Sequence, residues 1–475
     1  MADRTGIRGA SPIALVVLAV LTFSGSALAA PTPQPARQPV SALGAITQRG
    51  CLVDRSTPRA GCTPVRALSG PAPFLGSHAL AMSPDGTSLY AASSTSDAVA
   101  AFRRDPRTGA LTQASGKAGC IAAKGANGCA AARGLNGPNS VAVSPDGKFV
   151  YATSLVSDDV TVMRRNRSTG ALTQLPGTSG CVSGAAAVPG CATGRALDGP
   201  DVITVSADGR NVYVGSFLGN AVVTFTRDAS TGVLAQPADT TGCVALATAG
   251  CATGVALGAP EGLAASADGA SVYVAAAASN AVLTLQRDPS TGALTQTGCV
   301  ANAATTGCTT AVAIAGANAV TLSPDDDDVY VTSLLSNSVT SFARTTGTGQ
   351  LTQLTGTSAC AIYVVAVGCS LARSLNAPEG LAVSPDGASV YAAAYTSGTI
   401  DTFDRASTGA LLQKPRRPGC ITGRTAPDCT HGRALSGVSS LVVSPDGKHV
   451  YAAAFRSNAV TEYTRVTKAM TSGSN

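Results

Sequence analysis

The stretch PNSVAVSPDGKFVYATS, residues 138–154, decides the fold, because variants of it occur seven times along the chain. Each copy has a short apolar run, a Ser-Pro-Asp-Gly turn or a close variant of it, and a second run that contains a tyrosine. The serine that opens the turn stands at Ser83, Ser144, Ser206, Ser266, Ser323, Ser384 and Ser444, in steps of 57 to 62 residues. A regular period of this kind is the signature of a repeat architecture.

Each repeat predicts four short antiparallel strands. In the second copy these are residues 141–143, 149–153, 160–163 and 171–174, joined by turns that contain glycine. Short alternating strands between glycine turns are typical of β-hairpins. Repeated four-stranded units close into a radial propeller, whereas an open array would expose its sheet edges. We therefore expect an all-β, seven-bladed β-propeller of four-stranded blades.

The two ends of the chain indicate how the ring closes. Residues 44–48 copy the fourth-strand pattern, although no first three strands precede them. The last repeat has its first three strands and then only a weak fourth at 468–471. We expect the N-terminal strand to complete the last blade, with the propeller spanning 41–471 and a short tail at 472–475.

The first residues carry the pattern of an export signal. Residues 1–29 combine two arginines, an apolar run at 13–23 and a small-residue cleavage site, which predicts a signal peptide. The run is too short for a convincing membrane span. Residues 30–40 are rich in proline and predict an extended linker. We expect a secreted protein, extracellular or in the cell envelope, and a monomer.

The fourteen cysteines follow the repeat, with one pair per unit, and each pair brackets the long connection from a fourth strand to the next first strand. Disulfides persist in exported proteins, and no close Cys-x-x-Cys spacing suggests zinc. Connectivity does not follow from sequence alone, but pairing within each repeat is the simplest rule. This rule pairs Cys51 with Cys62, Cys120 with Cys129, Cys181 with Cys191, Cys243 with Cys251, Cys299 with Cys308, Cys360 with Cys369 and Cys420 with Cys429.

Two further columns of the repeat are nearly invariant, and both predict structure. A tyrosine follows each repeat serine by seven residues, as at Tyr90, and an arginine follows it by twenty-one, as at Arg165. We interpret the tyrosines as packing between blades. We expect each arginine to form an exposed pair with the aspartate in the turn of its own repeat, which contributes under about 1 kcal/mol.

One column varies among the repeats although all its members are polar. Five residues before each repeat serine, at the start of the first and innermost strand, stand His78, Asn139, Asp201, Glu261, Asn318, Glu379 and Ser439. In a propeller these side chains would meet at the mouth of the central channel, so we call them the channel ring. Asp201, Glu261 and Glu379 could hold Ca²⁺, or His78, Glu261 or Glu379 could act in general-base catalysis. Asn139, Asp201, Asn318 and Ser439 would then bind ligand, while the alternative is a hydrated, inert lining.

Arginines also recur eleven residues before four of the repeat serines, at Arg133, Arg195, Arg373 and Arg433. They could steer an anionic ligand to the channel face or, as we favour, cap loop carbonyls. The 33 Lys and Arg and 27 Asp and Glu give a net charge of +6 that is dispersed along the chain, which makes nucleic acid an unfavourable partner.

The repeat at 138–151, together with Thr-Gly-Ala-Leu-Thr-Gln at 169–174, resembles YVTN-type propellers and the seven-bladed lactonase family, which includes 6-phosphogluconolactonases. The resemblance implies a lactonase-like protein that hydrolyses or binds a small lactone or related ligand, with His78 where such a histidine occurs. No arginine stands in the ring, in contrast to that family. The ring's acidic composition is similar to that of calcium-dependent gluconolactonases, which implies Ca²⁺ or His78 as activator and Glu261 or Glu379 as ligand or base.

The competing hypothesis is a non-catalytic extracellular scaffold that binds another protein or a surface. Its support is the weakly charged, partly apolar loops at 182–189 and 362–367. Turnover of lactones would distinguish the enzyme from the scaffold.

Overall fold

The computed structural model describes residues 42–71, 78–184, 188–424 and 426–467. These residues belong to one compact unit. The predicted signal peptide, the linker, the weak fourth strand at 468–471 and the tail lie outside the described residues. No helix in the described part of the chain is long and apolar enough to cross a membrane.

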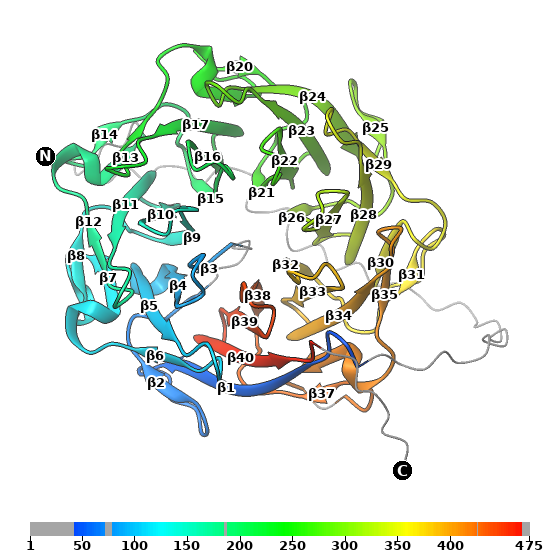
Figure 1. Cartoon of the computed structure of the whole chain (residues 1–475). Coiled ribbons are helices and arrows are strands. Elements are labelled where there is room, and N and C mark those ends of the chain that lie inside the picture. The colour runs from blue at the N-terminus through cyan, green and yellow to red at the C-terminus, as the bar shows by residue number, and fades with distance from the viewer. Residues whose placement is uncertain (1–41, 72–77, 185–187, 425, 468–475) are drawn as a thin grey trace, which may run out of the picture. The chain divides into compact units, whose positions relative to one another are not determined.

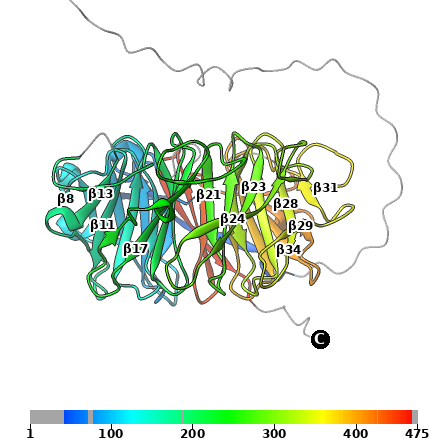
Figure 2. The ribbon, with the colours of Figure 1, turned by 90° about the horizontal axis from the view of Figure 1, so that it is seen from above.

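Seven mainly antiparallel sheets stand around a common axis as the blades of a propeller (Figure 1). The innermost strands contact one another in the closed order β3, β9, β15, β21, β26, β32, β38 and again β3. Seen from the edge of the ring, these strands run through the thickness of the disc (Figure 2). The predicted all-β, seven-bladed architecture is confirmed.

We number the blades in the order of the repeat serines. Blade 1 contains β3 (Leu80–Met82), β4 (Ser88–Ser93), β5 (Ala98–Arg104), β6 (Leu111–Gln113), β7 (Cys120–Ala123) and β8 (Ala130–Ala132). Blade 2 contains β9 (Pro138–Val143), β10 (Phe149–Ser154), β11 (Asp159–Arg165), β12 (Leu172–Gln174), β13 (Cys181–Ser183) and β14 (Ala192–Thr193). Blade 3 contains β15 (Pro200–Val205), β16 (Asn211–Ser216), β17 (Ala221–Arg227), β18 (Leu234–Ala235), β19 (Cys243–Ala245) and β20 (Ala252–Thr253). Blade 4 contains β21 (Pro260–Ala265), β22 (Ser271–Ala276), β23 (Ala281–Arg287), β24 (Leu294–Ala301) and β25 (Thr309–Thr310).

The remaining blades follow the same plan. Blade 5 contains β26 (Ala317–Leu322), β27 (Asp328–Ser333), β28 (Ser338–Arg344), β29 (Leu351–Gln353), β30 (Cys360–Ile362) and β31 (Ser370–Leu371). Blade 6 contains β32 (Pro378–Val383), β33 (Ser389–Ala394), β34 (Thr399–Arg405), β35 (Leu411–Gln413), β36 (Cys420–Thr422) and β37 (Thr430–His431). Blade 7 contains β38 (Val438–Val443), β39 (His449–Ala454), β40 (Ala459–Arg465), β1 (Ile46–Asp54) and β2 (Thr63–Val65). Short 3-10 turns are η2 (Ser94–Ser96), η3 (Gly116–Gly119), η4 (Ala126–Gly128), η5 (Gly177–Gly180), η6 (Thr240–Gly242) and η7 (Arg417–Gly419).

The blades have five or six strands rather than the predicted four. In blade 2 the fourth strand is divided, because η5 interrupts it and both β12 and β13 pair with β11. The short β14 then adds a parallel edge strand next to β13. A strand of two residues is too short to show an alternating pattern, which is why the sequence does not reveal it.

Blade 7 combines strands from the two ends of the described chain. Its order is β2-β1-β40-β39-β38, and β1 pairs antiparallel with β40 from Ile46↔Arg465 to Val53↔Ala459. Backbone hydrogen bonds between residues more than 400 positions apart therefore join the first described strand to the last one.

Every cysteine forms a disulfide within its own repeat, with sequence separations of 8 to 11 residues, so the predicted pairing is confirmed. The bridges join Cys51 to Cys62, Cys120 to Cys129, Cys181 to Cys191, Cys243 to Cys251, Cys299 to Cys308, Cys360 to Cys369 and Cys420 to Cys429.

The position of the bridges within the blades differs from the expected one. The cysteines were predicted to bracket a connection between strands, whereas in most blades the first cysteine opens the second half of the fourth strand. The second cysteine directly precedes the parallel edge strand in all seven blades, at Cys62, Cys129, Cys191, Cys251, Cys308, Cys369 and Cys429. Each bridge thus holds an edge strand that has few hydrogen bonds of its own, and closing a loop of this size contributes about 2–3 kcal/mol.

The repeated tyrosines pack between blades, as predicted, and they also form hydrogen bonds there. The Tyr90 hydroxyl donates to the carbonyl oxygen of Gly170 in the next blade at 2.8 Å and accepts from Arg165 Nε at 3.1 Å. The same contact joins each tyrosine to the neighbouring blade, with equivalents at Tyr151, Tyr213, Tyr273, Tyr330, Tyr391 and Tyr451.

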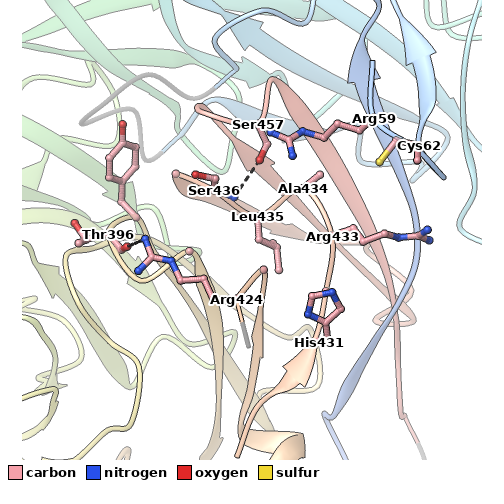
Figure 3. A pocket seen from close by; sticks show the side chains of 16 residues that line it. Arg59, Cys62, Thr396, Arg424, His431, Arg433, Ala434, Leu435, Ser436 and Ser457 are labelled. Atoms are coloured by element: carbon pink, nitrogen blue, oxygen red, sulfur yellow. Dashed lines mark hydrogen bonds between the residues drawn. The ribbon is translucent and has the colours of Figure 1, made fainter. Parts of the chain in front are cut away.

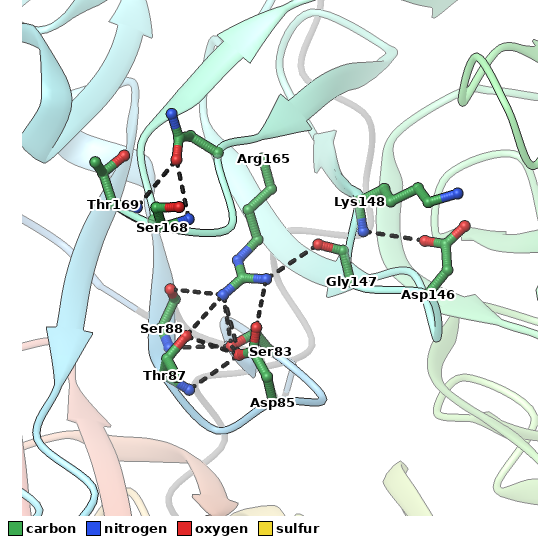
Figure 4. Close-up of polar contacts among 12 residues, drawn as sticks. Ser83, Asp85, Thr87, Ser88, Asp146, Gly147, Lys148, Arg165, Ser168 and Thr169 are labelled. Atoms are coloured by element: carbon green, nitrogen blue, oxygen red, sulfur yellow. Dashed lines mark hydrogen bonds and ion pairs between the residues drawn. The ribbon is translucent and has the colours of Figure 1, made fainter.

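The predicted partner and exposure of the repeated arginines were wrong. The Arg165 side chain is fully buried, and its carboxylate partner is Asp85 of the preceding blade, at 2.9 Å (Figure 4). Arg165 also donates to Ser83, Thr87 and the carbonyl oxygen of Gly147. Ring closure places the third-to-fourth-strand turn of one blade beside the first turn of its neighbour, so the long guanidinium side chain reaches across the junction. The equivalent pairs are Arg104–Asp446, Arg227–Asp146, Arg287–Asp208, Arg344–Asp268, Arg405–Asp325 and Arg465–Asp386.

Candidate functional site

The channel ring lies at irregular points of the innermost strands. In blade 3, Pro200 pairs with Ser216 and Val202 with Gly215, so that Asp201 between them is left outside the ladder as a β-bulge. The same register shift occurs in blades 2, 4, 5, 6 and 7 at their ring residues. Bulges redirect a side chain away from the sheet face, and they are common beside functional sites.

The ring side chains are buried rather than lining a wide, hydrated channel. Asn139, Asp201, Glu261, Asn318, Glu379 and Ser439 are each at most 4% exposed. Asn139 Nδ2 donates to Asp201 Oδ1, which joins the ring residues of blades 2 and 3. In blade 5, Asn318 Nδ2 donates to the carbonyl oxygen of Pro378 and Asn318 Oδ1 accepts from Thr332. Asn318 therefore already has partners at both ends of its amide.

Three carboxyl groups form an acidic sector of the ring. Burial raises the pKa of Asp201 to about 7, although the hydrogen bond from Asn139 opposes this. Burial also raises the pKa of Glu261 well above its ordinary value, and the negative charges of Asp201 and Glu379 raise it further. Glu261 Oε2 has no hydrogen-bond partner among the described residues. An oxygen that is buried without a partner is rare and requires an explanation.

His78 stands at the more accessible part of the ring. It is half-buried, and its carbonyl oxygen accepts hydrogen bonds from the Val141 amide and from Ser140 Oγ of blade 2. Burial lowers the pKa of the His78 imidazole to about 4, so the His78 side chain is neutral at ordinary pH. Residues 72–77, which precede it, lie outside the described part of the chain.

The structure does not test the predicted calcium site in the acidic sector. Within the described ranges, no group of three His, Cys, Asp or Glu side chains is placed to hold one metal ion. The donor chemistry of Asp201, Glu261 and Glu379 suits Ca²⁺, and the charges of Asp201 and Glu379 act on Glu261. The calcium site therefore stays a prediction, and no step below uses it.

Three of the four predicted channel-face arginines cap loop carbonyls. Arg133 donates to the carbonyl oxygen of Gly177, Arg195 to that of Pro237 and Arg373 to that of Lys414, each in the following blade. Arg66 does the same for Ala114, and the sequence did not show it because the connection before the first repeat is longer. Arg433 differs, since among the described residues only its backbone forms hydrogen bonds, both with the Gln48 side chain.

Comparison with known proteins agrees with the fold. Residues 137–310 match the model of a family described as Lactonase, 7-bladed beta-propeller, and this segment includes Asn139, Asp201 and Glu261. No curated protein matches the chain.

Two solved structures show the same architecture. One is a protein from Bacteroides uniformis that is provisionally described as a 6-phosphogluconolactonase, at 21% identity and a TM-score of 0.51, covering 77% of this chain and 88% of that one. The other is the periplasmic gluconolactonase of Pseudomonas aeruginosa, at 16% identity and a TM-score of 0.50, covering 82% of this chain and 95% of that one. The protein is thus a seven-bladed β-propeller of lactonase-like fold, with the lactonase family signature across residues 137–310.

Proposed function

We propose that the protein hydrolyses a small lactone at the channel ring, using the acidic sector as an acid–base pair. The observation that carries the proposal is Glu261, whose buried Oε2 has no partner and whose carboxyl lies beside the charges of Asp201 and Glu379. Disulfides in every blade support an oxidising compartment, either extracellular or periplasmic. The family signature over residues 137–310 supports the substrate class.

The two carboxyl groups differ in protonation near neutral pH. Asp201, with a pKa of about 7, is partly ionised there and suits a general base. Glu261 keeps its proton, because burial and two neighbouring carboxylates oppose its ionisation. Neighbouring groups whose pKa values are pushed apart can serve as base and acid in one site.

Lactone hydrolysis then follows in two steps. Ionised Asp201 takes a proton from water as the water oxygen bonds to the lactone carbonyl carbon, while the Glu261 carboxyl donates a hydrogen bond to the carbonyl oxygen, where negative charge develops. The intermediate collapses by breaking the ring C–O bond, and the proton held by Asp201 goes to the leaving alkoxide. The product is the open-chain hydroxy acid. Neutral His78 contacts the lactone at the accessible side of the ring.

The test uses purified protein and a panel of neutral γ- and δ-lactones, with acid release followed in a pH-stat. We expect turnover that rises with pH through about 7, because the base form of Asp201 is required. Glu261→Met should lower kcat by roughly 10²–10³, the usual effect of removing one oxyanion donor. The matched control is Glu462→Met, since Glu462 lies on β40, where it accepts from the Leu111 amide. Absence of turnover of every lactone, or equal loss in both variants, contradicts the proposal.

A second candidate, a non-catalytic scaffold, is favoured by one loop. Between Cys360 and Cys369 in blade 5, Val364, Val365 and Val367 are 62%, 80% and 99% exposed. Large apolar side chains grouped on a surface mark contact sites for other molecules. A Val365→Asp/Val367→Asp variant should lose retention on an apolar chromatography matrix. The scaffold is the better account if the lactone panel is negative as well.

A further inference from the structure

A pocket of about 480 Å³ lies between blades 6 and 7 and contains none of the channel ring residues. Its walls come from the connection between β37 and β38, the turn between β33 and β34, and the loop before β2. Figure 3 shows Arg59 and Arg424 on opposite sides of the segment 434–436, with His431 below it. The pocket is therefore a site separate from the proposed reaction centre.

The lining of this pocket is cationic and has no opposing charge. Arg59, Arg424, Arg433 and His431 line it, and none of the lining residues is Asp or Glu. None of the ion pairs formed among described residues includes any of these arginines. Guanidinium groups without a carboxylate partner in a hollow surface attract oxyanions.

The repeat provides three equivalent pockets for comparison. All four pockets contain the same hydrogen bond, from a backbone amide to a serine Oγ. In the blade 6–7 pocket the Ser436 amide donates to Ser457 Oγ at 3.0 Å. In the other three pockets the amides of Asn376, Asn136 and Ser69 donate to Ser397, Ser157 and Ser96. The lining of these three pockets includes carboxylates, namely Asp428, Asp97, and Asp54 with Asp97. Among the four pockets, only the one between blades 6 and 7 has no carboxylate in its lining.

The same pocket also lacks an internal hydrogen-bond acceptor that every other junction has. Fourteen residues after the repeat serine, six blades carry Asp or Asn, whose side-chain oxygen accepts a backbone amide of the next blade at 2.7–2.9 Å. The acceptors are Asp97, Asp158, Asn220, Asn280, Asn337 and Asn458. In blade 6 this position is Gly398, which has no side chain to offer.

The amide that Gly398 leaves without a side-chain acceptor points to a ligand. The equivalent amide belongs to Gly437, which lines the pocket together with Gly398. The Gly437 N–H donates to no described residue. An amide without an acceptor costs free energy unless another molecule accepts from it.

Arg433 also lacks the role that its equivalents have. Arg133, Arg195 and Arg373 cap carbonyls at the interruption of the next blade's fourth strand. The strand that faces Arg433 is β1, which runs without interruption from Ile46 to Asp54. In blade 4 the fourth strand is also continuous, as β24, and the residue facing it is Val255. An arginine at position 433 is therefore not needed for capping.

We infer that the pocket between blades 6 and 7 binds a small ligand through an oxyanion group, a carboxylate or a phosphate. One oxygen of this group accepts the Gly437 N–H in the place where Asp or Asn oxygens stand at the other six junctions. Arg59 and Arg424 on the two sides supply the balancing positive charge, and Arg433 adds to it. The positive charge selects oxyanions over neutral ligands, and the amide donor requires an acceptor oxygen at this point of the pocket.

The decisive variant is Gly398→Asn, which restores the residue type of the other junctions. Gly398 has φ +65, in the left-handed region that the six Asp and Asn residues also occupy with φ of 47 to 55. A Cβ there would lie 3.2 Å from the carbonyl oxygen of Leu435, so a small local shift accommodates it. The asparagine oxygen should then accept the Gly437 N–H and exclude the ligand.

The experiment titrates the full-length protein with inorganic phosphate and, separately, with citrate, at constant ionic strength set with chloride. Amide-resolved NMR and calorimetry are the readouts. We expect saturable binding of at least one oxyanion, with the Gly437 amide among the most shifted signals. Gly398→Asn should abolish this shift, and Arg424→Gln should weaken binding by at least about tenfold, since a charge-assisted hydrogen bond contributes this much. Preference for phosphate or for citrate assigns the ligand class.

The matched control is Asn337→Gly in blade 5. It removes the acceptor of the Ala377 amide, which Asn337 Oδ1 binds at 2.7 Å, but the adjacent pocket keeps Asp428. We expect this variant to show the same single oxyanion site as the native protein and no second one. No saturable binding of either oxyanion, or binding unchanged in Gly398→Asn, overturns the inference.

Discussion

The clearest test of how the ring is held together is Arg104→Met at the junction of blades 1 and 7. The Arg104 side chain is 2% exposed, and its Nη2 donates to both carboxylate oxygens of Asp446 at 2.9 and 2.8 Å. Its Nε donates to the Tyr451 hydroxyl at 2.9 Å, and its Nη1 donates to the carbonyl oxygen of Gly86 at 3.1 Å. Methionine keeps the length of the stem and removes these four hydrogen bonds, together with the contact of 2.6 Å between Arg104 Nη2 and His449 Nδ1.

The expected loss of unfolding free energy is about 3 kcal/mol. Removing one member of a buried ion pair costs about 3–5 kcal/mol, because the other charge stays without compensation. Here the lower end applies, since the Asp446 side chain is 31% exposed and water can solvate it. The Tyr451 hydroxyl keeps its donation to the carbonyl oxygen of Gly109.

The assay is equilibrium unfolding in urea, with Arg107→Met as the control. Arg107 is exposed in the same turn, and its substitution should change stability by less than about 0.5 kcal/mol. If Arg104→Met costs no more than this control, the buried arginine pairs do not hold the blades together. The double variant Arg104→Met/Asp446→Asn should lose less than the sum of the single variants, because the two groups interact directly.

The pair also has a defined pH dependence. Partial burial raises the pKa of Asp446, but the hydrogen bonds from Arg104 and Ser444 prevail and lower it to about 2. A folded-state pKa below the unfolded value gives stability that is complete above about pH 4 and is lost as pH falls toward 2. The difference in stability between the native protein and Arg104→Met should therefore shrink over this interval.

Three further predictions concern stability. Burial raises the pKa of Asp201 from 3.8 to about 7, so the native protein loses stability as pH rises through this interval and the buried carboxyl ionises. Asp201→Asn should therefore stabilise the protein at pH 8 by up to about 4 kcal/mol in urea unfolding and have little effect at pH 4. Equal effects at both pH values would show that Asp201 does not titrate this way. Deleting residues 41–62 should lower the melting temperature far more than deleting 468–475, because β1 supplies the antiparallel partner of β40; the reverse order would contradict the role of the N-terminal strand. Cys299→Ser/Cys308→Ser should cost about 2–3 kcal/mol, the value for a loop of this length, and a calorimetric loss near zero would show that the edge strand is held by other contacts.

The sequence repeat predicts the architecture because every blade forms the same internal contacts and the same junction with its neighbour. The spacing of Ser144 and its equivalents, the tyrosines seven residues later and the paired cysteines all follow from needs within a blade or at one repeated junction. Local pairing such as Cys360 with Cys369 is therefore readable without coordinates. The divided fourth strand could not be predicted from the sequence. Pairing with β11 and the disulfide position β13 and β14, whose own residues show no strand pattern.

For the candidate site, too, the sequence predicted one part and the tertiary structure decided the other. The polar column of the channel ring is visible in the sequence, because Glu261 and Glu379 interrupt strands that are otherwise apolar. Their burial, and the coupling that raises the pKa of Glu261, depend on distances across the ring between residues of different blades. No property of one repeat contains those distances.

The sequence by itself therefore determined the seven blades and their order, and its repeat predicted the disulfide pairing, because these arise from contacts within a repeat or from the period itself. Only the tertiary structure decided that Arg165 pairs with the preceding blade's Asp85 and that Gly398 leaves the Gly437 amide without a side-chain acceptor. The physical reason is that closing a ring brings together residues about 40 to 80 positions apart, or at opposite ends of the chain, and the identity of a partner across such a junction is set by geometry and not by sequence spacing.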